Sequence, residues 1–143
     1  MTPSVPKARV LFVCIGNSCR SQMAEGFARK YGGDVLIAAS AGLAPAMDVS
    51  PYTIRTMDEK DIDVRDHFPK GLTQLGRAQF DLIVNMSGFD LPTTITTPER
   101  EWAVPDPIGE SLETYGKIRD QIEGLVMGLI LELRRDSERR GMP

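Results

Sequence analysis

Ala8-Arg-Val-Leu-Phe-Val-Cys14-Ile-Gly-Asn-Ser-Cys-Arg20-Ser21, near the start of the chain, carries the strongest structural signal of the sequence. Its first half is apolar and rich in strand-forming residues, so that residues 8–13 are predicted to form a strand. A helix is predicted over residues 21–31, because Met23, Phe27 and Tyr31 recur at helical spacing. The sequence therefore predicts a strand, a tight loop and a helix in direct succession.

The loop between this strand and this helix has the composition of an anion-binding site. Backbone N–H groups of such a loop and of the helix N-terminus favour negative charge at one place. Gly16 and Asn17 tolerate the left-handed backbone of a tight loop, and Arg20 can hold two oxygens of a tetrahedral oxyanion. The same field favours an ionised Cys14, to which Ser21 can donate a hydrogen bond. We expect Cys14 to be a nucleophile; a buried structural cysteine is the alternative.

Length and composition exclude several classes of protein. A chain of 143 residues without a linker-like stretch is expected to form one domain over residues 1–143, with residues 1–7 and 135–143 frayed. A net charge of −3 argues against a nucleic-acid partner, and no apolar run approaches a membrane span. Because the N-terminus lacks a signal-peptide core, we expect a cytoplasmic protein. Two cysteines and one histidine are too few for a closed zinc site, so no metal is expected.

Strand and helix patterns alternate along the rest of the chain. Further strands are predicted at residues 35–39, 81–85 and 101–104, and further helices at residues 51–60 and 115–133. This alternation predicts an α/β fold with an open parallel sheet, whose ligands bind at the carboxyl ends of the strands. Since Cys14 lies at that edge, we expect Ser40, residues 85–87 and the loop around Asp106 to converge on it.

Asp106 is the candidate acid. A thiolate that attacks phosphorus or arsenic needs a proton for the leaving oxygen, and a carboxylic acid near a bound anion has reason to keep its proton. Asp106 stands between Pro105 and Pro107, which restrict its approach to the site. A surface turn without a catalytic part is the alternative, because Pro-Asp-Pro is also common in turns.

Together these residues resemble the low-molecular-weight protein tyrosine phosphatase superfamily, and most closely its arsenate reductase branch. The resemblance is carried by Cys-Ile-Gly-Asn-Ser-Cys-Arg-Ser at residues 14–21 and by Asp-Pro at residues 106–107. The features that favour the reductase branch are residues 16–26, 40–42, 61–63 and 118–122 and Trp102. The resemblance implies a three-layer α/β sandwich, with a four-stranded parallel sheet in the order 2-1-3-4 flanked by helices on both faces.

The resemblance also implies a part for each candidate residue. Cys14 would be the nucleophile, Arg20 the oxyanion clamp, Ser21 the hydroxyl partner of the thiolate and Asp106 the acid. The oxyanion would lie in the loop made of Ile15, Gly16, Asn17, Ser18, Cys19 and Arg20.

A supporting network is implied behind this loop. Asn17, Glu25 and Ser40 match positions that help surround a structural potassium ion in the thioredoxin-coupled reductases. Lys70 stands where that site has a further acidic ligand, so that its ammonium group can replace the ion and no bound cofactor is expected. His67 matches a histidine of the branch. Solvated surface side chains are the alternative for Glu25, Lys70 and His67.

Two departures from the family bear on function. The thioredoxin-coupled reductases carry two further cysteines after the third strand, whereas residues 85–90 here contain none, and Ser87 stands near the place of the first. A reductase with this sequence would need an external thiol, such as glutathione, mycothiol or a glutaredoxin, or a disulfide between Cys14 and Cys19. The tyrosine phosphatases have tyrosines directly after the Asp-Pro, whereas Ile108 and Gly109 follow it here, which weakens the prediction of phosphotyrosine specificity.

Three functions remain open at this point. The first is an arsenate-reductase-like enzyme that uses the Cys14 thiolate and an external thiol. The second is a low-molecular-weight phosphatase that hydrolyses phosphotyrosine or other phosphomonoesters through a phosphocysteine. The third is a non-catalytic oxyanion-binding or redox-sensing protein with Cys14 and Cys19 as a switch, against which Asp106 argues, because a sensor needs no acid. The expected partners are a small oxyanion or phosphomonoester and a thiol-redox protein.

Overall fold

The computed structural model, which describes residues 5–75 and 78–141, has the alternating element order that the sequence predicts. Its elements are β1 (Ala8–Cys14), α1 (Arg20–Gly32), β2 (Leu36–Gly42), α2 (Pro51–Asp58), the 3-10 helix η1 (Leu72–Leu75), β3 (Leu82–Asn85), β4 (Glu99–Glu101) and α3 (Leu112–Gly141). The four strands pair in parallel in the order β2-β1-β3-β4, which confirms the implied sheet.

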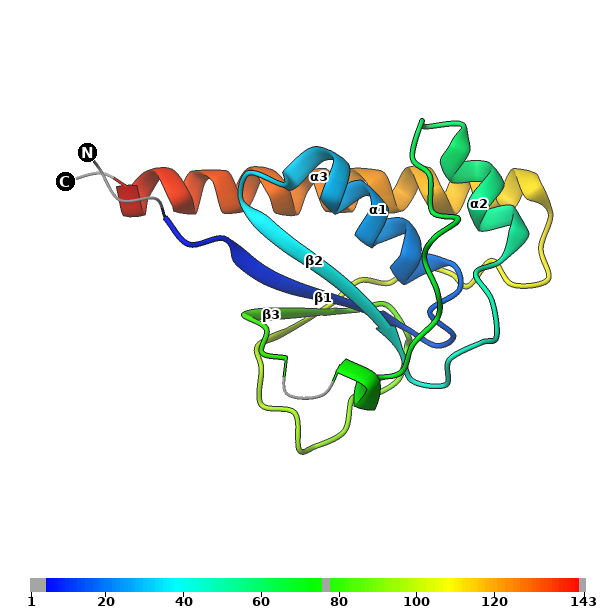
Figure 1. The fold of residues 1–143 in the computed structure, drawn as a ribbon, viewed down its shortest axis with the longest axis horizontal. Helices are drawn as coiled ribbons and strands as arrows, with labels where there is room; N and C mark the ends of the chain where they lie inside the picture. The colour runs from blue at the N-terminus through cyan, green and yellow to red at the C-terminus, as the bar shows by residue number, and fades with distance from the viewer. Residues whose placement is uncertain (1–4, 76–77, 142–143) are drawn as a thin grey trace.

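One face of the sheet is covered by the three α-helices (Figure 1). α1 packs on β1 and β2, and the long α3 runs beside α1 and α2. The side chains of β1 that face these helices, Val10 and Phe12, are fully buried. They form one apolar core with residues that include Met23, Phe27, Met57, Ile122 and Ile130.

The opposite face carries a different kind of layer. Here Leu11, Val13, Ala41 and Ile83 pack against Leu72, Leu75, Phe80, Leu91 and Ile95. Within the described residues, the helix of this layer is the short 3-10 helix η1, and the rest of the layer is irregular. The reason is local: residues 69–98 contain three prolines and no long apolar stripe at helical spacing.

The fourth strand lies earlier than its apolar residues predict. β4 is Glu99–Glu101, and all three residues are exposed at the edge of the sheet, where charged side chains discourage further pairing. The apolar residues after it leave the sheet. Trp102 turns its ring towards Phe12, with the ring centroids 6.0 Å apart, and the Val104 carbonyl accepts a hydrogen bond from Arg20. The prediction of a strand at residues 101–104 is therefore wrong in its position.

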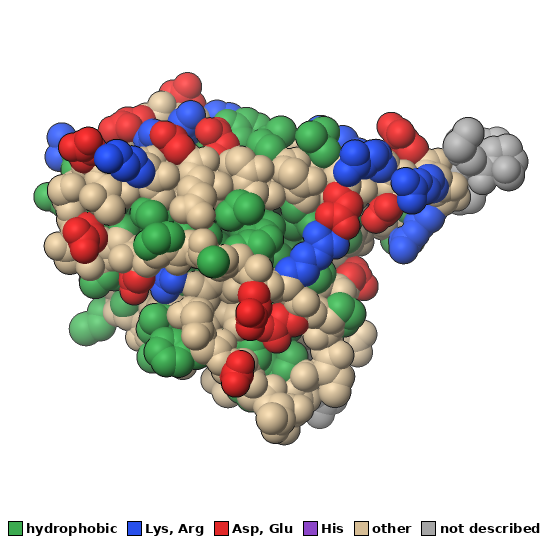
Figure 2. Space-filling model, turned by 180° about the vertical axis from the view of Figure 1, so that it is seen from behind, with side chains coloured by type: hydrophobic (Ala, Val, Ile, Leu, Met, Phe, Trp, Pro, Cys, Tyr) green, Lys and Arg blue, Asp and Glu red, His purple; other side chains and the backbone are tan. Residues whose placement is uncertain are grey.

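The last helix is longer than its apolar stripe. Residues 135–141, which were expected to fray, are helical up to Gly141. Arg134 explains part of this, because its guanidinium donates to Asp34 and to the Tyr31 carbonyl. Basic and acidic side chains alternate at this end of the molecule, on the right of Figure 2. Of the other residues expected to fray, 1–4 and 142–143 lie outside the described residues.

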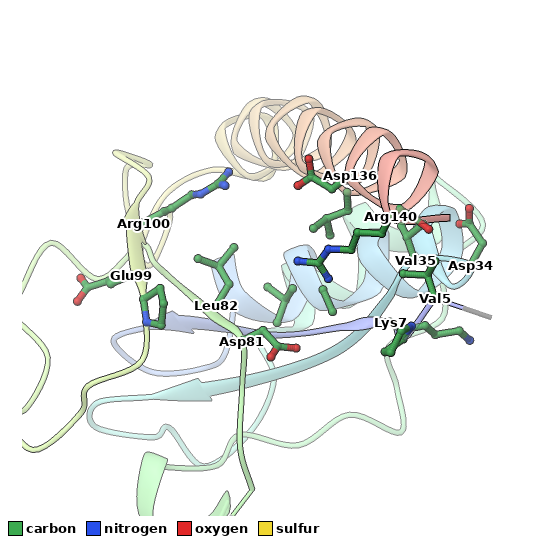
Figure 3. Close-up of a pocket in the computed structure, with 16 residues that line it drawn as sticks. Val5, Lys7, Asp34, Val35, Asp81, Leu82, Glu99, Arg100, Asp136 and Arg140 are labelled. Carbon is green, nitrogen blue, oxygen red and sulfur yellow. The ribbon is translucent and has the colours of Figure 1, made fainter. Parts of the chain in front are cut away.

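A cavity of about 460 Å³ lies at the amino ends of the strands (Figure 3). Charged side chains from the start of β1, the segment before β3 and the end of α3 line it, among them Lys7, Asp81 and Arg140. Cys14 lies at the other end of β1, so this cavity is separate from the candidate site. Among the described helices, none has the length and apolar character that a membrane crossing requires.

Candidate active site

The carboxyl end of β1 and the start of α1 hold the predicted anion-binding loop. Cys14 is the last residue of β1 and only 2 % exposed, and Arg20 is the first residue of α1. The sheet register pairs Cys14 with Gly42, and the next N–H, that of Leu43, donates to the Cys14 carbonyl at 3.1 Å. The end of β2 therefore supports the loop from one side.

Gly42 is a residue that this loop requires. A Cβ atom at Gly42 would lie 2.7 Å from the Ile15 carbonyl oxygen and 2.9 Å from the Asn17 nitrogen. Both are backbone atoms that cannot turn aside, so only glycine fits this close approach. Sequence reasoning noted Gly42 as part of the resemblance and gave it no role; a glycine at the end of a predicted strand was the available signal.

The backbone of the loop agrees with its predicted composition at one residue. Asn17 has a φ of 52°, in the left-handed region, whereas Gly16 does not adopt a positive φ. Gly16 instead lies against Ala46, whose Cβ would be 3.7 Å from a Cβ placed at Gly16. Of the two residues that tolerate a left-handed backbone, Asn17 therefore uses this tolerance and Gly16 does not.

The Cys14 sulfur contacts the hydroxyl group that the sequence predicts. Its Sγ lies 2.9 Å from the Ser21 Oγ, and the same Oγ accepts a hydrogen bond of 2.7 Å from the Asn17 side-chain amide. All three side chains are buried. Because a hydrogen bond to the charged form stabilises it, this arrangement can hold a thiolate.

Arg20 is positioned by two carbonyl groups from other parts of the chain. Its Nη1 donates to the Met86 carbonyl and, at 2.9 Å, to the Val104 carbonyl. Met86 directly follows β3, and Val104 follows β4, so that both strands contribute to the site through their backbone. Arg20 as a whole residue is 4 % exposed, and its Nη2 lies on the side of Asp106, at the mouth of the site.

Asp106 lies across the mouth of the site from Arg20. Its Oδ2 is 3.6 Å from Arg20 Nη2, and its Oδ1 accepts a hydrogen bond of 3.1 Å from the Ile108 N–H. The side chain is 40 % exposed, which lets it reach a ligand from the solvent side. An oxyanion held by Arg20 would therefore lie next to this carboxyl group.

Cys19 points into a different environment from that of Cys14. Its Sγ lies 3.5 Å from the Tyr115 hydroxyl, which also makes a 3.0 Å hydrogen bond with the Ser50 hydroxyl. Burial raises the pKa of the Cys19 thiol, and burial together with the Cys19 contact raises the pKa of Tyr115 to about 12. Both cysteines are free thiols, so a Cys14–Cys19 redox pair stays a prediction.

The supporting network is gathered around Glu25, which is buried. One carboxylate oxygen accepts a 2.8 Å hydrogen bond from the Ser40 hydroxyl, and the other lies 3.4 Å from both Arg29 and His67. Burial lowers the pKa of His67, and the Glu25 charge opposes that shift. Ser40 therefore lies behind the loop, and its expected convergence on Cys14 does not occur.

The residues behind the loop do not fit a bound potassium ion. The Asn17 side-chain oxygen accepts the backbone N–H of Lys70 at 3.0 Å, and the Ser40 hydroxyl donates to Glu25. Burial lowers the pKa of Lys70, and the negative charge of Glu25 partly opposes this shift. The ammonium group of Lys70 therefore interacts electrostatically with the Glu25 carboxylate. Within residues 5–75 and 78–141, every buried side-chain nitrogen or oxygen has a partner, and no cluster of acidic, His and Cys side chains suits a metal ion.

Residues 85–89, at the end of β3 and after it, make hydrogen bonds with one another. The Ser87 hydroxyl donates to the Asn85 side-chain oxygen at 2.7 Å, and the Asn85 amide donates to the Phe89 carbonyl at 2.8 Å. Of residues 85–87, Met86 comes nearest to the site: its N–H donates to the Val13 carbonyl at 2.7 Å, and its carbonyl accepts from Arg20.

Comparisons with known proteins agree with this geometry. The family model described as low molecular weight phosphotyrosine protein phosphatase matches residues 9–139. A glutaredoxin arsenate reductase of Synechocystis is 35 % identical over 129 residues, which cover 87 % of this chain and 98 % of the relative. Arsenate reductase 1 of Bacillus cereus is 37 % identical over 120 residues, which cover 81 % of this chain and 89 % of the relative.

A solved structure of an arsenate reductase in the phosphate binding state superimposes with a TM-score of 0.79 at 34 % identity, covering 88 % of this chain and 98 % of that chain. The family match spans most of the sequence, including the loop, Arg20 and Asp106. The chain therefore belongs to the low molecular weight phosphotyrosine protein phosphatase family of cysteine-dependent enzymes.

Proposed function

We propose that this enzyme reduces arsenate at Cys14 and takes its electrons from an external thiol. The observation that carries the proposal is the buried Cys14–Ser21 contact at the N-terminus of α1, with Arg20 and Asp106 at the mouth. The two curated relatives reported above, both named arsenate reductases, support the choice of substrate.

In the first step the Cys14 thiolate attacks the arsenic of dihydrogen arsenate held by the loop N–H groups and Arg20. A sulfur–arsenic bond forms and an arsenic–oxygen bond breaks. The leaving hydroxyl group takes the proton of Asp106 and departs as water. Arsenic remains As(V) in this adduct, whose negative charge stays within reach of Arg20.

In the second step an external thiolate attacks the Cys14 sulfur. A disulfide bond forms, and the electron pair of the sulfur–arsenic bond remains on arsenic, which leaves as As(III) and takes up a proton to give arsenite. A second external thiol attacks the outer sulfur of the mixed disulfide and releases the Cys14 thiolate. One arsenate and two thiols thus give one arsenite, one disulfide and one water.

The need for an external thiol follows from the position of Cys19, the only other cysteine of the sequence. Its thiol is buried against Tyr115, and its raised pKa keeps it protonated. A Cys14–Cys19 disulfide needs Cα atoms about 4.4–6.8 Å apart and correct Cβ directions, and forming it would distort the oxyanion loop. We therefore propose glutathione with a glutaredoxin, or mycothiol, as the reductant, and with it a cytoplasmic location, where such thiols are kept reduced.

Phosphomonoester hydrolysis is the second candidate function, and the family description, which names a phosphatase, is the observation behind it. The same thiolate would attack phosphorus, Asp106 would protonate the leaving alcohol, and water would hydrolyse the phosphocysteine. The exposed Ile108 beside Asp106 supplies no aromatic ring for a phenol.

The experiment measures arsenite formation with glutathione alone, glutathione plus glutaredoxin, mycothiol, and thioredoxin, beside hydrolysis of an aryl phosphate. We expect the glutaredoxin or mycothiol systems to support turnover and thioredoxin alone to be poor. Cys14→Ser should abolish both reactions, whereas Cys19→Ser should retain most activity. Efficient turnover with thioredoxin alone, lost in Cys19→Ser, would instead establish an internal relay. Aryl phosphate hydrolysis without arsenite formation from any thiol would establish the phosphatase.

A further inference from the structure

We propose that the rim of the active-site mouth is a docking surface for a thiol-redox protein whose reactive cysteine is surrounded by basic and apolar side chains. The mouth rim consists of two residues from each of three segments, Met47, Asp48, Phe89, Asp90, Ile108 and Glu110. This inference rests on the external thiol of the proposed function, and it names the class of molecule that brings a thiol to the site.

Two of the three segments are tied to the site by backbone hydrogen bonds. The Ala46 N–H donates to the Gly16 carbonyl at 2.9 Å, so residues 47 and 48 directly follow a contact with the oxyanion loop. The Ile108 N–H donates to Oδ1 of Asp106 at 3.1 Å, and Oδ2 of the same carboxylate lies 3.6 Å from Arg20. Residues 108–110 therefore follow directly on the acid at the mouth.

The third segment follows β3 and reaches the same place. Gly88 lines one cavity together with Arg20, Val104 and Pro105, so it lies next to the segment that leads to Asp106. Phe89 and Asp90 come next in the chain and are exposed. All three segments therefore lie around Arg20 and the oxyanion loop.

Each segment exposes one large apolar side chain. Met47 is 94 % exposed, Phe89 61 % and Ile108 58 %. Covering such side chains releases water from apolar surface, so exposed apolar side chains that gather in one area are typical of a protein interaction surface. A small thiol cannot cover all three at once, which favours a protein as the occupant.

Each segment also carries an acidic residue next to its apolar residue or two positions after it. Asp48, Asp90 and Glu110 are exposed, and among the described residues none of their carboxylates belongs to an ion pair. No lysine or arginine occurs in the three segments, which are residues 43–53, 86–91 and 103–111. The mouth rim therefore carries a negative charge that its own segments do not neutralise.

The oxyanion substrate does not explain this charge. Arsenate is an anion, and carboxylates at the opening of a site lower the local concentration of anions. Free glutathione has two carboxylates and one ammonium group, so its net charge is negative too. A protein with lysines or arginines around its cysteine is attracted by the same field, which acts over a Debye length of about 8 Å at physiological salt. Charge complementarity therefore selects a basic protein partner.

The depth of Cys14 explains why such a partner must touch the rim. Cys14 is only 2 % exposed, and in its mixed disulfide with glutathione the outer sulfur is one bond of about 2 Å away from the Cys14 sulfur. The thiolate of the partner attacks that outer sulfur. A disulfide between partner and glutathione forms, the bond to Cys14 breaks, and its electron pair stays on the Cys14 thiolate. A protein sulfur that comes so close brings the surface around it onto the mouth rim.

The test follows this last step without arsenate. The Cys14–glutathione mixed disulfide is prepared with oxidised glutathione, and its position is verified by fragmentation mass spectrometry. Release of glutathione is then measured against the concentration of a glutaredoxin that has lysines beside its reactive cysteine. Dithiothreitol, a small uncharged thiol, is the reference reductant, because it reaches the disulfide without covering the rim.

Two pairs of substitutions separate the apolar part of the rim from the charged part. Met47→Ser with Phe89→Ser removes apolar surface, and Asp48→Lys with Glu110→Lys reverses the charge. The matched controls are two exposed residues in the second half of α3, Leu131→Ser and Glu138→Lys.

We expect the apolar pair to raise the KM for glutaredoxin about fivefold. The charge-reversed pair should raise it about tenfold, because it removes the electrostatic attraction between the two proteins. The rate with dithiothreitol should not change in either pair. High salt should raise the KM of the wild type and affect that of the charge-reversed pair much less. A glutaredoxin whose lysines are changed to glutamate should bind the charge-reversed pair better than the wild type.

The proposal is overturned if neither pair changes the KM for glutaredoxin more than its control does. An equal loss with glutaredoxin and with dithiothreitol would also refute it, because the substitutions would then have damaged the site itself. A raised KM for a basic phosphotyrosine peptide, with an unchanged KM for glutaredoxin, would assign the rim to a phosphoprotein substrate instead. Should the charge-reversed pair not fold, the apolar pair and the salt dependence of the wild type decide.

The outcome is separable from that of the proposed function, because the mixed-disulfide assay contains no arsenate. A raised KM for glutaredoxin in both pairs, in an enzyme that forms no arsenite, would support this inference and refute the proposed function. An unchanged KM in an enzyme that forms arsenite would do the reverse.

Discussion

Replacing Gly42 with alanine should damage the active site without unfolding the protein. The new Cβ would lie 2.7 Å from the Ile15 carbonyl oxygen, and ordinary contact begins near 3.4 Å, so the loop backbone must move by about 0.7 Å. A displacement of 1 Å at reacting groups costs about 100-fold in rate, so we expect kcat/KM to fall between about 10- and 100-fold. The free energy of unfolding should fall by about 1–3 kcal/mol, as for other overpacked sites.

Gly32→Ala is the matched control for this prediction. A Cβ at Gly32 would also meet an atom at 2.7 Å, but that atom belongs to the Ile130 side chain, away from the loop. Steady-state kinetics of arsenite formation and urea unfolding should be measured on both variants. Wild-type kcat/KM in Gly42→Ala, or an equal loss in Gly32→Ala, would refute the argument that Gly42 is needed for the loop.

Three further predictions follow from other parts of the structure. Asp106→Asn should slow hydrolysis of an unactivated aryl phosphate by about 10²–10⁴-fold, and by less with a leaving group of low pKa; equal losses for both esters would leave Asp106 without a role as acid. Burial lowers the pKa of His67 in the folded protein below its usual 6.5, so the contribution of His67 to the free energy of unfolding is complete above pH 6.5 and is lost as the pH falls through the folded-state pKa. In urea unfolding, His67→Gln should not show this loss of stability at acidic pH. The same pH dependence in His67→Gln and in the wild type would contradict the prediction. Arg119→Met should lower the free energy of unfolding by about 1–3 kcal/mol, because its Nη1 bonds the Thr56 carbonyl at 2.9 Å and holds α2 to α3; Arg55→Met, at an exposed position of α2, should change little, and equal losses would refute the assignment.

The contact between Cys14 and Ser21 was predictable because both residues belong to one short stretch of the chain. Cys14, Ser21 and Arg20 belong to one strand, loop and helix, whose apolar periodicity and glycine–asparagine pair are visible in the sequence. The parallel order of the strands was equally accessible through the resemblance. Periodicity alone predicts that strands and helices alternate along the chain, and it does not predict which strands are neighbours in the sheet.

The parts that could not be predicted are contacts between distant segments and the exact ends of elements. Arg20 is held by the backbone carbonyls of Met86 and Val104. Because every residue has such a carbonyl, the sequence does not indicate which residues make these contacts. The fourth strand was predicted too late in the chain, because the exposed edge strand β4 has no apolar pattern and the apolar Trp102 packs outside the sheet.

The shortness of β4 has a consequence for how the enzyme loses activity. This three-residue strand is exposed, and the segment after it carries Val104 and Asp106 to the site. Segments with little buried surface open at lower free energy than the core does, on their own and reversibly. Inactivation by mild urea should therefore precede the loss of helical circular dichroism. Amide hydrogens of residues 99–104 should exchange with solvent faster than those of β1. A bound oxyanion should slow this exchange, because it would bind Arg20, which also donates to the Val104 carbonyl.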